Sequence, residues 1–190
     1  MAVRTFIALD LDDAILDGLE EVSDKLDDSR GKIRWVAREN LHVTLRFLGE
    51  VGDELVAEAC SRAAKAAGRA GRFDYDVAGL TCVPPSGPLR MLWTGILDVS
   101  GKMLELHDLL EGELADLGLH SEDRRFKPHL TLARIAHLPD ARAFRQAAEA
   151  HKDRLFGTQQ ASEIVVYSSK LTPSGPVYSP MSRASLEGPG

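Results

Sequence analysis

The chain has few cysteines and no long apolar run. Its 190 residues include two cysteines, Cys60 and Cys82, without C-x-x-C spacing. This usage predicts a reduced, cytoplasmic setting and argues against a structural zinc site. No stretch approaches the roughly 20 apolar residues that a membrane-spanning helix needs. The first residues reach the acidic Asp10 at once, which is typical of an opening strand and not of a signal peptide.

Signals for common nucleotide-binding folds are also absent. The sequence has neither a phosphate-binding P-loop nor a glycine-rich dinucleotide loop. The formal net charge is −6. This charge argues against broad binding to duplex nucleic acid, because such binding needs a large basic face. With 44% hydrophobic and 27% charged residues, the chain can bury the core of one domain or of two intimate lobes.

One four-residue motif occurs twice. Residues 42–45 read H-V-T-L and residues 129–132 read H-L-T-L, 87 positions apart. Successive side chains of a strand point to opposite faces, so the histidine and threonine of each copy share one face. Two such strands would supply two imidazoles as acid and base around one phosphorus, and two hydroxyls for its oxygens.

Two other interpretations of the motif are weaker. Either histidine could be an ordinary strand residue, but matched histidines with matched threonines favour a site. Two histidines without a nearby third ligand fall short of zinc coordination, so we expect no metal or other cofactor. The remaining histidines have no such context and are expected on the surface or on helices: His107, His120, His137 and His151.

The duplication extends beyond the motif. An apolar segment lies 36 residues before each motif histidine, beginning at Phe6 in one copy and Trp93 in the other. Each half therefore predicts strand, helix, motif strand, helix and strand. We expect one two-lobed domain over residues 1–190, with sequence halves 1–88 and 89–182 and a flexible tail at 183–190. Whether the lobes follow these halves or exchange strands is open at this stage.

Periodicity and turn residues place the elements. Strands are expected at 5–11, 33–36, 42–49, 73–83, 90–99, 125–135 and 161–170. Helices are expected at 13–26, 53–67, 100–117 and 139–151, with loops at 84–88 and 172–176.

Positive charge concentrates beside both motifs. Residues 30–46 contain five basic residues and one acidic residue, and residues 124–134 contain four basic residues and none that is acidic. This pattern favours an anionic ligand at the motifs. The alternative is ordinary solvated loop charge.

At the motifs the chain resembles the two-histidine phosphoesterases, most closely the LigT-like RNA 2′,3′-cyclic phosphodiesterases. Two flanked signatures carry the resemblance, E-N-L-H-V-T-L-R-F-L-G at 39–49 and R-F-K-P-H-L-T-L-A-R at 125–134. Shorter segments agree with it at 6–10, 34–36, 92–93 and 175–178. The resemblance implies a bilobed α+β fold in which two β-sheet lobes, flanked by helices, enclose a central cleft lined by the motif strands.

The resemblance also implies an activity and roles. RNA or nucleoside 2′,3′-cyclic phosphates would be hydrolysed to 2′-phosphomonoesters without metal, with His42 as proton donor and His129 as proton acceptor. Thr44 and Thr131 would hold the phosphate oxygens. Two further positions resemble the pair that holds the terminal base, Phe47 by stacking and Arg134 by a cation–π contact.

Strand alternation complicates the assignment of Phe47 and Arg134. Each follows its motif histidine by five positions, which gives it the opposite parity, so each strand must end or bulge in between. Core packing for Phe47 and a surface ion pair for Arg134 are the alternatives, while Trp35 and Tyr178 are expected to pack. Alternative functions are RNA-end joining in the reverse direction, hydrolysis of another cyclic nucleotide, or a non-catalytic RNA-end or nucleotide-binding module.

Overall fold

The computed structural model describes residues 2–28, 30–119, 126–173 and 175–188. These residues form nine strands, four α-helices and two 3₁₀ helices. The strands are β1 Val3–Leu9, β2 Lys32–Trp35, β3 Val43–Val51, β4 Phe73–Val83, β5 Met91–Leu97, β6 His129–His137, β7 Leu155–Ala161, β8 Glu163–Thr172 and β9 Gly175–Ser185. The helices are α1 Asp13–Leu26, η1 Arg38–Asn40, α2 Asp53–Arg69, α3 Lys102–Leu114, η2 Ala115–Leu117 and α4 Ala141–Glu149.

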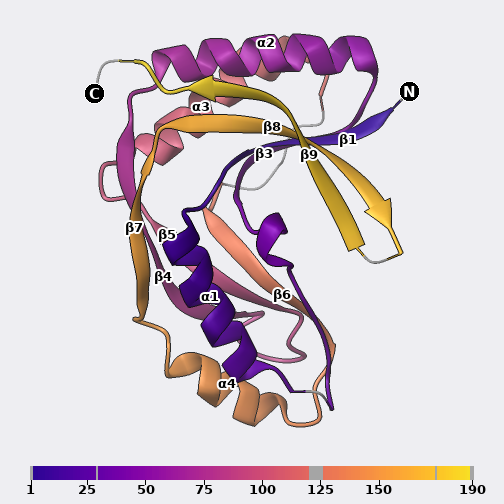
Figure 1. Ribbon diagram of the computed structural model, residues 1–190, viewed down its shortest axis with the longest axis vertical. Helices are drawn as coiled ribbons and strands as arrows, with labels where there is room; N and C mark the ends of the chain where they lie inside the picture. The colour runs from indigo at the N-terminus through magenta and orange to yellow at the C-terminus, as the bar shows by residue number, and fades with distance from the viewer. Residues whose placement is uncertain (1, 29, 120–125, 174, 189–190) are drawn as a thin grey trace.

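The strands form two antiparallel sheets (Figure 1). The first has the order β3-β1-β8-β9, and the second has the order β2-β6-β5-β4-β7. Each sheet holds one motif strand, β3 in the first and β6 in the second. Each sheet also combines strands from both halves of the sequence, so the lobes exchange strands. The fold is the expected α+β arrangement of two lobes, but the lobes do not follow the halves 1–88 and 89–182.

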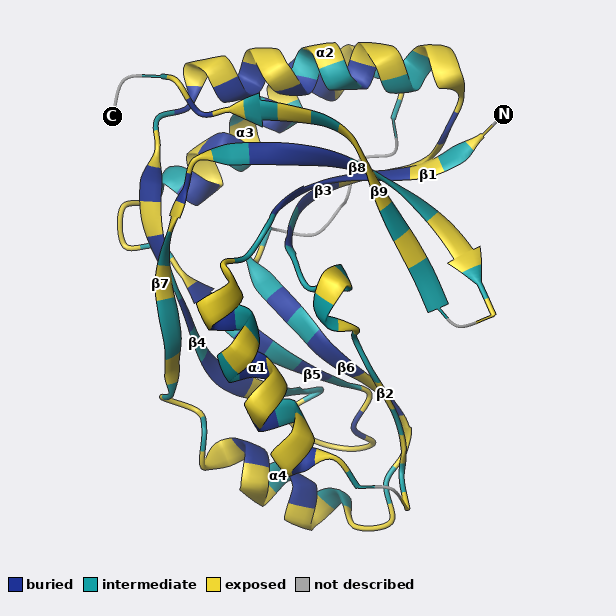
Figure 2. Cartoon of the chain, in the orientation of Figure 1, coloured by how far each residue is buried: buried dark blue, intermediate teal, exposed yellow. Residues whose placement is uncertain are grey.

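Helices cover each sheet from outside. Helix α2 contacts β1, β8 and β9, α3 contacts α2 and β3, while α1 contacts β7 and α4 contacts β4. Figure 2 shows their buried stripes turned toward the sheets. In α1 that stripe is Ile15, Leu19, Val22 and Leu26, and burying each such side chain contributes about 1.5–3 kcal/mol. No helix of the described residues is long and apolar enough to cross a membrane.

Two strands were not expected from the sequence. Strand β7, L-F-G-T-Q-Q-A, is too polar to be recognised by alternation, but it pairs with β4 at the sheet edge. Strand β9 begins inside the loop expected at 172–176 and contains Pro176 and Pro180. Because β9 is an edge strand with one neighbour, these prolines interrupt no second ladder.

The tail from residue 183 also differs from the flexible end that was expected. Arg183 and Ser185 lie within β9 and pair with β8. Leu186 is buried, and the Gly188 N–H donates to the Ala70 carbonyl oxygen at 2.9 Å. A Cβ atom at Gly188 would lie 2.3 Å from the Arg69 carbonyl oxygen, so only glycine fits this approach. Through residue 188 the tail is therefore a packed part of the lobe that contains the first sheet.

Several boundaries differ more modestly. Strand β6 begins at His129 instead of 125, and residue 125 itself lies outside the described residues. His120, Arg124 and Arg125 also fall there, so half of the second basic cluster has no structural description. Helix α3 ends at Leu114, and η2 continues it to Leu117, before Gly118 at a φ of 65°.

Candidate active site

A β-bulge re-aims the end of the first motif strand. Strand β1 pairs Ala8 with Thr44 but Ile7 with Arg46, which leaves Leu45 as an extra residue in β3. Leu45 and Arg46 are consequently both buried, and alternation restarts one position later. Phe47 thereby returns to the side of the strand that carries Thr44 and lines the same cavity.

The second motif strand contains an equivalent β-bulge. Strand β5 pairs Trp93 with Thr131 but Leu92 with Ala133, which makes Leu132 the extra residue in β6. Leu132 and Ala133 are both buried, and Arg134 joins Thr131 on the cavity side. The parity of Phe47 and Arg134 required each strand to end or bulge, and both strands bulge.

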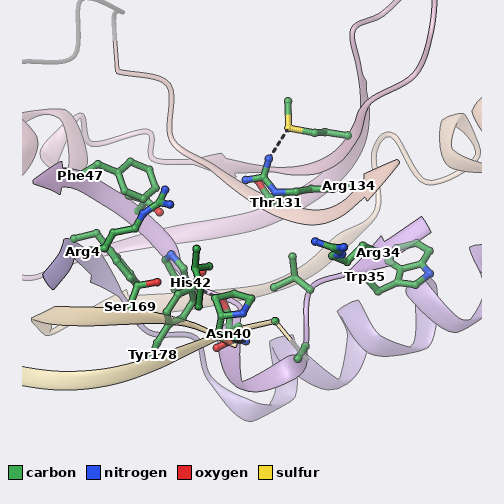
Figure 3. A pocket seen from close by; sticks show the side chains of 18 of the residues that line it. Arg4, Arg34, Trp35, Asn40, His42, Phe47, Thr131, Arg134, Ser169 and Tyr178 are labelled. Carbon is green, nitrogen blue, oxygen red and sulfur yellow. Dashed lines mark hydrogen bonds between the residues drawn. The ribbon is translucent and has the colours of Figure 1, made fainter. Parts of the chain in front are cut away.

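One cavity of about 620 Å³ collects all six site residues predicted from the sequence: His42, Thr44, Phe47, His129, Thr131 and Arg134. Figure 3 shows side chains from β1, β2, β3, β6, β8 and β9 around it. Because the motif strands belong to different sheets, the cavity lies where the two lobes meet.

The ring of His42 is fixed from two directions. Its Nδ1 lies 2.7 Å from the carbonyl oxygen of Asn40, at the end of η1. A carbonyl only accepts, so Nδ1 carries the proton and Nε2 remains for a ligand. The ring stacks on Phe6 of β1, with centroids 4.7 Å apart, and meets Tyr178 of β9 edge-on at 5.3 Å.

His129 has a matching environment. Its Nδ1 lies 2.8 Å from the carbonyl oxygen of Lys127, again two residues earlier in the chain. The ring stacks on Trp93 of β5, with centroids 3.9 Å apart. The apolar segments that precede the motifs by equal distances thus supply the aromatic partner of each histidine. Both imidazoles are held as the same tautomer, with Nε2 available to one ligand.

The threonines complete the symmetric set. Thr44 and Thr131 are half-buried, and neither hydroxyl has a hydrogen-bond partner within the described part of the chain. Each lies on the cavity side two residues after its histidine. Two unengaged hydroxyls can donate to the oxygens of a bound phosphate.

The electrostatics of the cavity favour an anion. Arg4, Arg34 and Arg134 line it, and no ion pair to any of them exists among the described residues. Burial lowers the pKa of His42, against the opposing effects of the Asn40 hydrogen bond and of Asp10. His42 is therefore biased toward the neutral imidazole until a ligand supplies negative charge.

The basic residues at 30–46 divide between the cavity and other tasks. Of the five, Arg34 alone lines the cavity. Arg30 pairs with Asp28, and Arg38 pairs with carboxylates of α1. One arginine of this stretch thus lies where a ligand could reach it, while Arg30 and Arg38 are paired with carboxylates away from the cavity.

Helix α3 contacts both motif segments. Arg46 is 4% exposed and forms an ion pair with Glu111 of α3. One turn earlier, the ring of His107 stacks on Phe126 with centroids 4.2 Å apart, three residues before His129. His107 is a helix residue, as expected, but its contact with the second signature was not foreseen.

Other cavity residues also escaped prediction. Tyr178 and Trp35 were expected to pack; both do, and both also line the cavity. Arg4 gave no signal beyond its place two residues before Phe6. Asn40 could be found through its position in the first signature. Its backbone carbonyl oxygen accepts from His42, and its side-chain amide donates to the Pro176 carbonyl at 3.0 Å.

Comparison with known proteins defines the class of this fold and site. The model of the family described as LigT like Phosphoesterase matches residues 9–93 and 97–178. The chain belongs to this family.

Individual relatives match over nearly their whole length. A protein of Methanocaldococcus jannaschii named RNA 2′,3′-cyclic phosphodiesterase is 30% identical, with 93% of this chain and 96% of the relative covered. The crystal structure of TT0787 of Thermus thermophilus superposes with a TM-score of 0.83 at 28% identity, covering 97% and 98% of the two chains. The structure of Escherichia coli LigT complexed with 3′-AMP gives a TM-score of 0.77 at 26% identity, covering 98% and 99%.

Proposed function

We propose that this protein is an RNA 2′,3′-cyclic phosphodiesterase that converts 2′,3′-cyclic phosphate ends of RNA or nucleotides to 2′-phosphomonoesters. One observation carries the proposal: two imidazoles of the same tautomer line one arginine-rich cavity with two threonine hydroxyls. Among the described residues, neither the Nε2 atoms nor these hydroxyls have a hydrogen-bond partner. The names of the relatives supply the substrate class, and the complex of E. coli LigT with 3′-AMP supports binding of a nucleotide.

The reaction needs two proton transfers on opposite sides of phosphorus. Water attacks phosphorus and gives a proton to Nε2 of His129, while the bond from phosphorus to the ribose 3′ oxygen breaks. That oxygen takes a proton from Nε2 of His42, which leaves the phosphate on the 2′ oxygen. The assignment of donor and acceptor rests on the family resemblance, since the two rings have matching hydrogen bonds.

The lowered pKa of His42 fits this assignment once substrate is bound. Burial disfavours the imidazolium in the empty cavity. A cyclic phosphate carries one negative charge, and that charge beside the ring raises the pKa again. The substrate thus promotes the protonated form that its own leaving oxygen requires. Thr44 and Thr131 donate to the non-bridging oxygens as their charge increases.

The terminal base lies between Phe47 and Arg134 in this proposal. The Phe47 ring is 40% exposed and lies on the cavity side of β3, which argues against a purely structural role. The Arg134 guanidinium has a weak contact with the Met91 sulfur at 3.9 Å and no carboxylate partner among the described residues. A planar cation and an aromatic ring can hold any base by its π face.

The proposal includes the domain organisation of the chain. The exchange of strands between halves supports one two-lobed domain, because neither half could complete its own sheet.

Cys60 and Cys82 are both free, which supports action in the reducing cytoplasm. No metal or other cofactor takes part, because protein groups perform both proton transfers.

The decisive test is hydrolysis of adenosine 2′,3′-cyclic phosphate in EDTA, with the product assigned by phosphorus NMR. We expect turnover to persist and the product to be the 2′-phosphate. Activity that vanishes in EDTA and returns with one divalent metal would exclude metal independence. Nucleotide binding without turnover would make the protein a binding module.

A further inference from the structure

Two arginines lie side by side on neighbouring strands that line the cavity. Arg34 of β2 and Arg134 of β6 are directly opposed in the antiparallel ladder, and both line the cavity. Like charges at opposed positions of neighbouring strands destabilise a sheet. A bound anion removes that repulsion, so this pair is built for a ligand with negative charge.

The neighbouring charges do not relieve the repulsion. Neither Arg34 nor Arg134 forms an ion pair with any described residue. Arg4, the third arginine of the cavity, differs because its opposed residue on β3 is Glu50. The uncompensated charge is therefore concentrated at the edge formed by β2 and β6.

The position of Arg34 separates it from the phosphate that reacts. That phosphate binds at the histidines and threonines. Arg134 lies about 7 Å of strand beyond Thr131, because the bulge at Leu132 places these two residues opposite Met91 and Trp93 of β5. Arg34 lies one strand further out, on the edge strand of the sheet. In Figure 3 Arg34 and His42 lie well apart along the cavity. A ligand that reaches both must be longer than a cyclic phosphate.

We propose that Arg34 binds the phosphodiester that joins the terminal nucleotide of the RNA to the nucleotide before it. With Arg134 at the terminal base, the next negative charge of the substrate lies one nucleotide upstream, and Arg34, directly opposite Arg134 on β2, is placed to bind it. The protein should therefore prefer an RNA end over a mononucleoside 2′,3′-cyclic phosphate. This inference rests on the proposed function and adds a second subsite to it.

The experiment compares kcat/KM for three substrates that carry the same terminal cyclic phosphate. They are adenosine 2′,3′-cyclic phosphate, the dinucleotide ApA with that end, and the same dinucleotide with an uncharged methylphosphonate linkage. We expect the wild-type protein to favour the natural dinucleotide over the methylphosphonate by about tenfold. Arg34→Ala should abolish that preference and leave the mononucleoside nearly unaffected.

Lys32→Ala is the matched control. Lys32 is an exposed cation two residues from Arg34 on the same strand, but it does not line the cavity. Its loss should leave all three substrates unchanged. Equal rates for both dinucleotides in the wild type, or an equal loss on all substrates in Arg34→Ala, would overturn the subsite. Failure to hydrolyse any of them would instead overturn the proposed function.

A second measurement uses the wild-type protein alone, so it tests the contact even if Arg34→Ala folds poorly. A contact between Arg34 and the phosphodiester is weakened by salt, since binding releases a counterion. In the wild type, KM for the natural dinucleotide should rise more steeply with salt than KM for the methylphosphonate. Equal slopes would contradict the contact.

Discussion

His42 and His129 have the same local geometry and different surroundings. Each donates from Nδ1 to a carbonyl two residues earlier, and each stacks on an aromatic ring of the adjacent strand. His42 also has Tyr178 against its ring edge and a pKa that burial lowers. The duplicated sequence thus accounts for the matched geometry of the rings, whereas the contact with Tyr178 is specific to His42 among the described ring contacts.

The different surroundings of the two histidines originate outside the motifs. The ring of Tyr178 comes from β9, in the C-terminal hairpin β8–β9, and the second sheet places no corresponding hairpin beside His129 among the described residues. A difference in acid and base roles therefore need not be written in the motifs. It can arise from a residue that contacts one histidine alone among the described residues, as Tyr178 contacts His42.

Removing either histidine should have the largest effect. We expect His42→Ala and His129→Ala each to lower kcat by about a hundredfold or more, the range for loss of a general acid or base. The measurement is steady-state hydrolysis of adenosine 2′,3′-cyclic phosphate, with folding checked by circular dichroism. His151→Ala, outside the cavity, is the control and should retain full activity. Full activity in either motif variant would make that histidine a structural residue.

The aromatic contact to the base should have a smaller effect and act on binding. Phe47→Ala removes a stacked ring that contributes about 1–3 kcal/mol. We expect KM for base-bearing substrates to rise about five- to a hundredfold with kcat little changed. Ribose 2′,3′-cyclic phosphate without a base is the control and should be indifferent to the substitution. An equal effect on both substrates would favour a packing role for Phe47.

The smallest expected effect is a displacement along the pH axis. A proton donor is lost as pH rises through its pKa, so His42 should set the falling limb of the rate. Its pKa in the free protein lies below the ordinary value, and bound phosphate raises it. The falling limb of kcat should consequently lie at higher pH than that of kcat/KM. Coincident limbs would contradict coupling between the substrate charge and His42.

Local pattern was enough to predict much of this molecule. The bounds of β4 agree at both ends, and the alanine spacing of α2 gives its buried face at Ala59, Ala63 and Ala67. The parity of Phe47 and Arg134 required each motif strand to end or bulge before them, and the structure has a bulge in both. These predictions succeed because each depends on side-chain periodicity within one element.

The features that were missed depend on contacts between distant segments. The polar β7 forms a strand because β4 offers a free edge, and β9 tolerates two prolines because no described strand pairs with its outer side. Strand exchange between the halves cannot be read from either half alone. Arg34 seemed one of five similar basic residues, and its place in the cavity and its register with Arg134 distinguish it.

The division of labour between the two histidines is tested most directly by changing the leaving group. A 3′-thio analogue of the cyclic phosphate expels a thiolate, which leaves without needing a proton. We predict that this substrate restores hydrolysis to His42→Ala and leaves His129→Ala impaired. Restoration of His129→Ala alone would exchange the two roles. Equal impairment of both variants on the thio and the natural substrate would contradict proton donation by either histidine to the leaving atom.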